Sequence, residues 1–380
     1  MKTNTLIIGA GPAGAACAIR LMQAGVECLL IDKQSFPRQK LCAGLFTQKS
    51  QKCLRALVGN EKYDECMNNS LRNEEESFNL YGKDHKLLVS CKPPKPITLI
   101  DREKFDQWLV NFYISLGGQF KDNTQITDID FVQQTAKISD YEVQYDHLIA
   151  ADGANSFVER LLAKKYPDTF KKKRKSSMCM EINVDKDDLK MDGVNIFFDI
   201  VPDSYAWVFN KTGKTCIGLV KLPDHDFDVN SAMRRFIQEL KVQHVEKYPL
   251  RGAMLPIGAY MEKPYHWNTL FVGDAAGFVE PLTGEGIYYA LQSGTYAAEA
   301  IIDKGDTNRL YLEKTKYLTQ LIDKGQKYQN MLESTSKRNL FYRHAGKHPN
   351  FISYFYDTQI ENGCLDSFWK IVLKYFFCKK

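Results

Sequence analysis

The sequence predicts an α/β fold in which a lobe built on a parallel sheet carries an inserted, largely antiparallel sheet and a helical C-terminal region. A strand, a glycine-rich turn, a helix and a second strand follow one another within the first 32 residues. Strand-like alternation recurs between about 176 and 250, and a long helical pattern begins at Arg309. The predicted boundaries are 1–75, 96–165 and 250–302 for the first lobe, 76–95 and 166–249 for the inserted lobe, and 303–380 for the C-terminal region.

The N-terminal unit is typical of a Rossmann-type nucleotide-binding motif. An apolar strand runs into the turn Gly9-Ala10-Gly11-Pro12-Ala13-Gly14 and then into a helix of small residues. Gly9 permits the tight turn, Gly11 lets a pyrophosphate approach the backbone, and Gly14 lets the helix pack on the strand. The second strand ends in Asp32, 18 residues after Gly14, where a carboxylate can accept hydrogen bonds from the adenosine ribose. This motif predicts a bound dinucleotide but does not separate FAD from NAD.

Later segments narrow the choice of nucleotide. One strand ends in Asp152-Gly153, and another ends in Gly273-Asp274 and continues through Pro281-Leu282-Thr283-Gly284-Glu285-Gly286-Ile287 into a helix. Arg102 stands at the start of a further helix. In this order, and together with the N-terminal motif, these segments resemble the flavoprotein superfamily of p-hydroxybenzoate hydroxylase. The resemblance implies FAD as the cofactor and a substrate chamber roofed by the inserted sheet.

The resemblance also implies roles for individual residues. Asp274 would hold the ribityl chain, and the backbone amides of Gly284 and Gly286 would face the pyrimidine edge of the isoalloxazine ring. That edge gains negative charge when the flavin is reduced, and a helix N-terminus placed there stabilises the charge.

Two further signatures resemble a particular family. Arg38-Gln39-Lys40-Leu41-Cys42-Ala43-Gly44 follows the second strand, and Tyr205-Ala206-Trp207-Val208-Phe209 lies in mid-chain. Together they resemble the geranylgeranyl reductase family, whose members reduce isolated C=C bonds of prenyl chains. In that family a Cys-Gly pair lies by the flavin, and a Tyr-x-Trp-x-Phe-Pro strand lines the prenyl cavity. The chain departs from the family pattern at Ala43, which interrupts the usual Cys-Gly-Gly, and at Asn210, which replaces the proline.

These motifs and resemblances assign a candidate site without a metal. The expected catalytic residues are Cys42 and Tyr205, and the expected substrate-binding residues are Tyr205, Trp207, Phe209 and Pro281. The expected cofactor-binding residues are Gly9, Gly11, Ala13, Gly14, Asp32, Lys33, Arg38, Cys42, Ala43, Gly44, Arg102, Asp152, Gly273, Asp274, Gly284, Gly286 and Ile287.

The alternation of the mid-chain strand places Tyr205, Trp207 and Phe209 on one face, where they would form the wall of an apolar tunnel. The alternative is that they are ordinary core aromatics. Cys42 follows Arg38 and Lys40, whose charges favour a thiolate or a thiol that donates a proton. With ten cysteines in the chain, an inert buried thiol is the competing interpretation of Cys42.

Composition and charge indicate which kinds of partner and which cell compartment to expect. The 44% hydrophobic content and 26% charged content are those of an ordinary globular protein, and no apolar run is long enough for a membrane span. Met1–Asn4 leads directly into a strand, so we expect a cytoplasmic protein without a signal peptide. The cysteines show no metal-ligand spacing, and the basic run 171–175 lacks a nucleic-acid motif.

The net positive charge of the chain is concentrated in its last eighty residues. From Ile301 onward 14 Lys and Arg stand against 8 Asp and Glu, a balance of +6, whereas the whole chain has +5. This segment ends in the basic aromatic stretch Phe368–Phe377, for which core packing and a peripheral membrane contact are alternative interpretations. The electron donor is expected to be NAD(P)H or an acidic ferredoxin-like carrier protein, because no second Rossmann motif is visible.

Three functions fit these patterns. The first is reduction of C=C bonds in a prenyl or related hydrophobic substrate, a small molecule or lipid, by hydride transfer from reduced flavin. The second is an FAD-dependent monooxygenase acting on an aromatic or polyketide-like molecule. The third is a non-catalytic flavin-binding or quinone-docking protein. A flavin-dependent halogenase is disfavoured because Tyr205 and Phe209 depart from the Trp-x-Trp-x-Ile-Pro pattern of that group.

Overall fold

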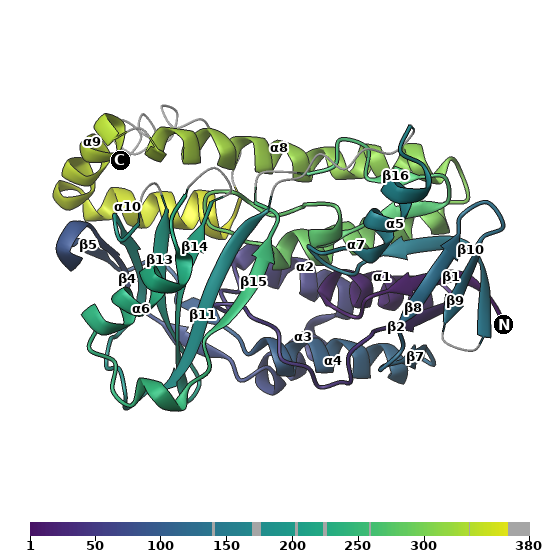
Figure 1. Cartoon of the computed structure of the whole chain (residues 1–380), viewed down its shortest axis with the longest axis horizontal. Helices are drawn as coiled ribbons and strands as arrows, with labels where there is room; N and C mark the ends of the chain where they lie inside the picture. The colour runs from purple at the N-terminus through teal and green to yellow at the C-terminus, as the bar shows by residue number, and fades with distance from the viewer. Residues whose placement is uncertain are drawn as a thin grey trace.

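The computed structural model describes residues 1–138, 141–168, 176–201, 204–222, 226–257, 260–333 and 335–363. The basic run 171–175 and the aromatic segment 368–377 lie outside these residues. The described residues form a sheet of eight strands, a sheet of seven strands and a two-stranded pair, with helices packed around them (Figure 1).

The N-terminal lobe is organised around β1 (Lys2–Ile8), which pairs in parallel with β2 (Cys28–Ile31) and β10 (Tyr141–Ala150). The strand order is β16-β17-β10-β1-β2-β7, and β8 and β9 extend β10 as an antiparallel ribbon. The carboxyl halves of the central strands are apolar and buried, as expected where helices cover a parallel sheet. The other strands are β7 (Gln119–Lys121), β8 (Ile126–Asp130), β9 (Thr135–Ile138), β16 (Tyr265–His266) and β17 (Thr269–Phe271).

Helix α1 (Pro12–Gln23) packs against α4 (Arg102–Ser115) and, most extensively, against α7 (Ile287–Ile302). A Cβ added to Gly294 of α7 would lie 2.0 Å from the carbonyl oxygen of Ala13, so the two helices approach backbone to backbone. Small residues therefore set the distance between α1 and α7. The other helices of this lobe are α2 (Gln48–Val58), α3 (Asn60–Asn69) and α5 (Phe157–Lys165).

The second sheet has the order β15-β11-β14-β13-β12-β4-β5 and is antiparallel except where β12 runs parallel to β4. Helix α6 (Val229–Glu239) buries Met233 and Phe236 against one face of it. The strands are β4 (Phe78–Tyr81), β5 (Leu87–Cys91), β11 (Ser177–Asp185), β12 (Val194–Phe198), β13 (Tyr205–Lys211), β14 (Lys214–Lys221) and β15 (Arg251–Leu255), and the separate pair is β3 (Asn73–Glu75) with β6 (Ile97–Leu99).

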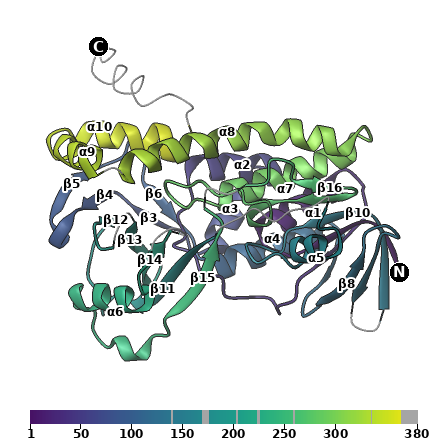
Figure 2. The ribbon, with the colours of Figure 1, turned by 45° about the horizontal axis from the view of Figure 1, so that its top comes forward.

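The C-terminal region is a layer of helices along one side of both sheets (Figure 2). Helix α8 (Thr307–Glu333) runs along the molecule, and α9 (Thr335–Lys347) and α10 (Pro349–Phe355) turn back to contact β5. The π-helical turn Tyr356–Glu361 follows α10. Within the described part of the chain, no helix combines the length and the apolar character that crossing a membrane requires.

Most elements expected from the sequence are confirmed. Helix α4 begins at Arg102, helix α8 covers the helical pattern at Arg309, and strands recur between residues 177 and 221, as the patterns predict. The pair α2 and α3, and the two short helices after α8, were not predicted. Helix α3 has few apolar residues, and α10 is only 7 residues long, so neither has a strong periodic signal.

A buried carboxyl group attaches the end of the described chain to α2. Glu361 Oε2 accepts a hydrogen bond from the backbone N–H of Gln48 at 2.6 Å, and Oε1 accepts one from the Tyr356 hydroxyl at 2.6 Å. Burial raises the pKa of Glu361 to about 7, although both hydrogen bonds act to lower it. The C-terminal layer is therefore held by a group that titrates near neutral pH.

The raised pKa predicts a pH-dependent stability. Because the folded state binds this proton more tightly than the unfolded chain, the stabilisation is complete below the unfolded pKa of about 4.5. It is lost as pH rises through about 7, a change of about 3 kcal/mol in the free energy of unfolding. Urea unfolding of Glu361→Gln should lack this decline. The exposed control Glu313→Gln should retain it, and an equal decline in both variants would contradict the assignment.

Candidate functional site

The turn after β1 has a geometry that admits only glycine at two positions. Gly9 has φ +104°, and a Cβ there would lie 2.3 Å from the carbonyl oxygen of Ala151. A Cβ on Gly14 would lie 1.9 Å from the carbonyl oxygen of Gly9. At Gly11 the added atom would meet only the end of the Arg38 side chain, at 3.3 Å. Gly9 and Gly14 therefore shape the turn, and Gly11 leaves its surface open.

Asp32 is fixed at the end of β2, beside this turn. Its Oδ2 accepts a hydrogen bond from the N–H of Ala10 and its Oδ1 one from the N–H of Gln34, both at 2.9 Å. The guanidinium of Arg38 lies 3.6 Å from Oδ2. The carboxylate is thus oriented by the turn, as the sequence predicts for a ribose ligand.

Two arginines share one buried carboxylate. Asp106, on α4, is fully buried and accepts two hydrogen bonds from Arg102, at 2.9 and 3.0 Å. The Arg38 guanidinium lies 3.2 Å from the same carboxylate. Burial acts to lower the pKa of Arg102, but the Asp106 carboxylate outweighs it and raises the pKa. Asp106 was not predicted as a site residue, because only the fold brings Arg38 to it.

The segment from Cys42 to Gly44 is held by two cations. The Arg102 guanidinium lies close enough to Cys42 for the two side chains to interact, and Lys211 at the end of β13 donates to the Cys42 carbonyl oxygen. The N–H of Gly44 donates to Cys42 Sγ at 3.4 Å. Two cations that are distant in sequence from Cys42 thus lie beside this segment.

Strand β13 presents Tyr205, Trp207 and Phe209 to one cavity, as their alternation predicts. The rings of Tyr205 and Trp207 have centroids 6.1 Å apart. The Tyr205 hydroxyl lies 3.1 Å from the position that a Cβ would take on Gly284. Burial raises the pKa of Tyr205 well above its ordinary value, so this phenol keeps its proton. The aromatic strand therefore reaches the loop that precedes α7.

That loop opens the N-terminus of α7 toward the same cavity. Gly286 is the N-cap of α7 and makes no side-chain cap hydrogen bond. Gly11 caps α1 in the same way, without a side-chain partner. Both cap residues line the cavity, together with Asp274. Two uncapped helix N-termini facing one space form favourable sites for negative charge.

These segments line one central cavity of about 820 Å³. Its polar end is lined by the turn after β1 and by the predicted cofactor residues Asp32, Lys33, Arg38, Arg102 and Asp152. Its middle is lined by Cys42, Ala43, Gly44, Asp274, Gly284, Gly286 and Ile287. Its apolar end is lined by Phe78, Leu80, Tyr205, Trp207, Phe209, Phe341, Ile352 and Phe355.

The donor set fits FAD. A dinucleotide needs a carboxylate for the ribose, free backbone amides for the pyrophosphate and an electropositive edge for the flavin ring. Asp32, the N-terminus of α1 and the N-terminus of α7 provide these groups at one cavity. Among the described residues no cluster of metal-ligating side chains is present.

Three predicted residues do not line this cavity. Gly14 packs against the turn, and Gly273 packs against α1, where a Cβ would lie 3.0 Å from that of Ala13. Both glycines influence the shape of the site because they allow neighbouring backbone segments to pack closely. Pro281 does not line this cavity, because its ring is turned toward Gly325 of α8, and its assignment to substrate binding stays a prediction. Conversely, the aromatic side chains of α9 and α10 that close the apolar end were not predicted.

Comparisons with known proteins agree with this geometry. The FAD binding domain family matches residues 2–306. An uncharacterized protein of Methanosarcina barkeri is 32% identical over 84% of this chain and 80% of its own length. A digeranylgeranylglycerophospholipid reductase of Methanococcus aeolicus is 24% identical over 89% of this chain and 88% of its own.

A solved structure has the same fold. The geranylgeranyl bacteriochlorophyll reductase-like protein of Thermoplasma acidophilum superposes with a TM-score of 0.75 and covers 100% of this chain and 97% of its own. The sequence identity is 19%. The fold is thus that of the p-hydroxybenzoate hydroxylase-like flavoproteins, as the sequence resemblance implies.

Alanine substitutions at Gly14 and Gly11 should have different effects, one on stability and the other on FAD binding. Gly14→Ala places a methyl group against the Gly9 carbonyl and should destabilise the fold, lowering the melting temperature of the apoprotein by several degrees. Gly11→Ala should leave that temperature nearly unchanged but abolish FAD binding, because its methyl group occupies the path of the pyrophosphate. Scanning calorimetry and flavin absorbance separate the two effects. A Gly11→Ala protein that purifies with full flavin content would contradict this placement of FAD.

Proposed function

We propose that this chain, which belongs to the FAD binding domain family and within it to the geranylgeranyl reductase family of FAD-dependent oxidoreductases, reduces C=C bonds of a prenyl chain or a related hydrophobic substrate. The observation that carries this proposal is the continuity of the cavity. Its apolar end begins at the loop before α7, where the Tyr205 hydroxyl approaches Gly284. A long apolar substrate would therefore extend directly away from the flavin.

The apolar end has the composition expected for a hydrocarbon ligand. Phe78 and Leu80 of β4 face the same space as the aromatic strand β13, and Phe341, Ile352 and Phe355 close it from α9 and α10. An alkyl chain bound there would remove apolar surface from water, which contributes about 25 cal/mol of favourable free energy per Å² buried. The names of relatives support the same substrate class, since they include geranylgeranyl diphosphate reductase and menaquinone reductase.

An isolated alkene is a poor hydride acceptor, so the residues of the cavity must compensate. Reduced FAD, when bound, would supply a hydride to one alkene carbon. The cavity walls would have to hold the alkene within about 3–3.5 Å of the hydride donor and exclude water. A proton must then reach the other carbon, which completes addition of two hydrogens across the double bond. Tyr205 and Cys42 are the proposed donors, because both line the cavity beside the loop.

Tyr205 is placed to donate because its hydroxyl lies in the cavity beside Gly284, where the alkene would meet the flavin. Cys42 is suited for a second reason: its thiol lies beside Arg102, which would stabilise the thiolate left after donation. Electrons for the flavin are proposed to come from NAD(P)H or a ferredoxin-like carrier.

The decisive experiment reduces the bound flavin with dithionite under anaerobic conditions, removes excess reductant and adds geranylgeranyl diphosphate. We expect the oxidised flavin spectrum to return and a product heavier by two hydrogens per double bond to appear by mass spectrometry. Because dithionite supplies the electrons, the result does not depend on the physiological donor. A flavin that stays reduced until oxygen is admitted would contradict prenyl reduction and favour a monooxygenase.

The same assay separates the proposed proton donors. Tyr205→Phe and Cys42→Ser should each slow reoxidation by roughly 100-fold or more, the usual contribution of a general acid. Cys53→Ser is the matched control, because this partly buried thiol lies on α2 outside the cavity, and it should leave the rate unchanged. A variant with normal flavin content and an unchanged rate removes that residue from the mechanism.

A further inference from the structure

A buried ion pair lies behind the loop that precedes α7. Lys49 of α2 places its Nζ 2.6 Å from Oε2 of Glu285, and the two side chains are only 9% and 3% exposed. Glu285 lies between Gly284 and Gly286 in the sequence, and it lines the central cavity. The sequence motifs assign no role to either member of this pair.

The carboxylate of Glu285 is fixed by more than the lysine. Its Oε1 accepts hydrogen bonds from the hydroxyls of Thr47, at 2.5 Å, and Ser50, at 3.2 Å. Thr47 is the N-cap of α2, and its hydroxyl also accepts from the N–H of Ser50. Two hydroxyl donors, the N-terminus of α2 and the Lys49 ammonium thus surround this carboxylate, and all of them favour negative charge at this position.

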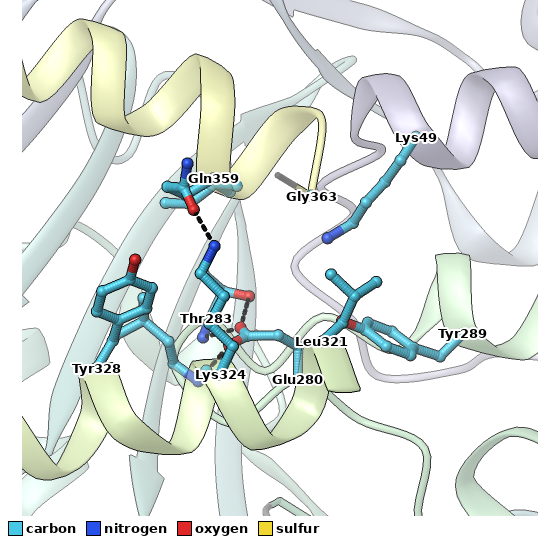
Figure 3. A pocket seen from close by; sticks show the side chains of 12 residues that line it. Lys49, Glu280, Thr283, Tyr289, Leu321, Lys324, Tyr328, Gln359 and Gly363 are labelled. Carbon is cyan, nitrogen blue, oxygen red and sulfur yellow. Dashed lines mark hydrogen bonds between the residues drawn. The ribbon is translucent and has the colours of Figure 1, made fainter. Parts of the chain in front are cut away.

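Lys49 brings the compensating positive charge from the opposite side. Its ammonium lies 5.4 Å from the ring centroid of Tyr288 and 5.5 Å from that of Tyr289. Figure 3 shows its side chain extending from α2 into a small pocket that adjoins the central cavity. Other ionisable groups around the pair are Glu280, Glu361, Lys324 and Tyr356.

The position of this pair has an electrostatic consequence. The amides of Gly284 and Gly286 are proposed to face the flavin edge that becomes more negative on reduction. An uncompensated carboxylate between them would disfavour reduction, and an uncompensated ammonium would favour it, because charges interact strongly in a buried site. When the pair is intact its two charges offset one another, and the N-terminus of α7 adds a positive dipole at this edge.

We propose that Lys49 and Glu285 form a charge-balanced pair that sets the reduction potential of the bound flavin. Lys49 acts as a positioning residue through Glu285 and does not touch the reacting atoms. The proposal rests on the placement of FAD given under the proposed function, but it does not depend on the substrate.

The test is a redox titration of the FAD-loaded full-length protein, followed by flavin absorbance. Glu285→Gln keeps the hydrogen bond to Thr47 and leaves the ammonium unbalanced, so the midpoint potential should become more positive. Lys49→Met leaves the carboxylate unbalanced, so the potential should become more negative. The double variant Lys49→Met, Glu285→Gln should return close to the wild-type potential. Opposite signs in the single variants are the signature that a merely structural role would not produce.

Controls keep the outcome clear. Lys314→Met removes a lysine from a 2.8 Å ion pair with Glu299, at the other end of α7, and should leave the potential unchanged. Lys49→Arg preserves the charge and should stay near wild type. If Lys49→Met fails to fold, the positive shift of Glu285→Gln alone decides the matter. Single variants that shift in the same direction, or that do not shift, would overturn the proposal.

Because the titration uses no prenyl substrate, its result is separate from that of the reoxidation assay. A correct potential shift without prenyl reduction would leave this inference standing and remove only the substrate assignment. If the protein reduces the prenyl substrate but the single variants show no shift in potential, the substrate assignment stands and this inference is overturned.

Discussion

The backbone contact between α1 and α7 is the constraint on which the site depends. These helices can approach so closely only because Gly294 has no side chain where it faces Ala13. The contact places two helix N-termini on the same cavity, one after each of two parallel strands of the sheet. Neither N-cap glycine has a side chain to cap its helix, and the positive ends of both helix dipoles face the cavity, where they favour a ligand with negative charge at two separate places.

The remaining parts of the site adapt this scaffold to a long ligand. The polar half of the cavity belongs to the parallel-sheet lobe, where Asp106 orders Arg38 and Arg102. The apolar half is built by the second sheet and closed by the C-terminal helices. The loop before α7 lies between the two halves. A cofactor and an apolar substrate can therefore meet at this loop, with the aromatic strand β13 reaching it from the substrate side.

The sequence was most informative where function is local along the chain. The turn from Gly9 to Gly14, the acid at Asp32 and the alternation of β13 each predict geometry from short-range spacing, and each is found in the structure. Asp106, the Lys49–Glu285 pair and the aromatic residues of α9 and α10 could not be predicted in the same way. Their partners are distant in sequence, and Lys49 and Glu285 are 236 positions apart. Charged residues are usually exposed, so nothing in the sequence marks these as buried.

The central claim is that one continuous cavity holds FAD at its polar end and an alkyl chain at its apolar end. A crystal structure of the protein with FAD and a saturated prenyl alcohol tests it most directly. The account predicts the isoalloxazine ring between Cys42 and the loop before α7, with the alkyl chain extending along Tyr205, Trp207 and Phe209 toward α10. FAD in this position with the alkyl chain bound outside the cavity, or an isoalloxazine ring turned away from the loop, would contradict the account.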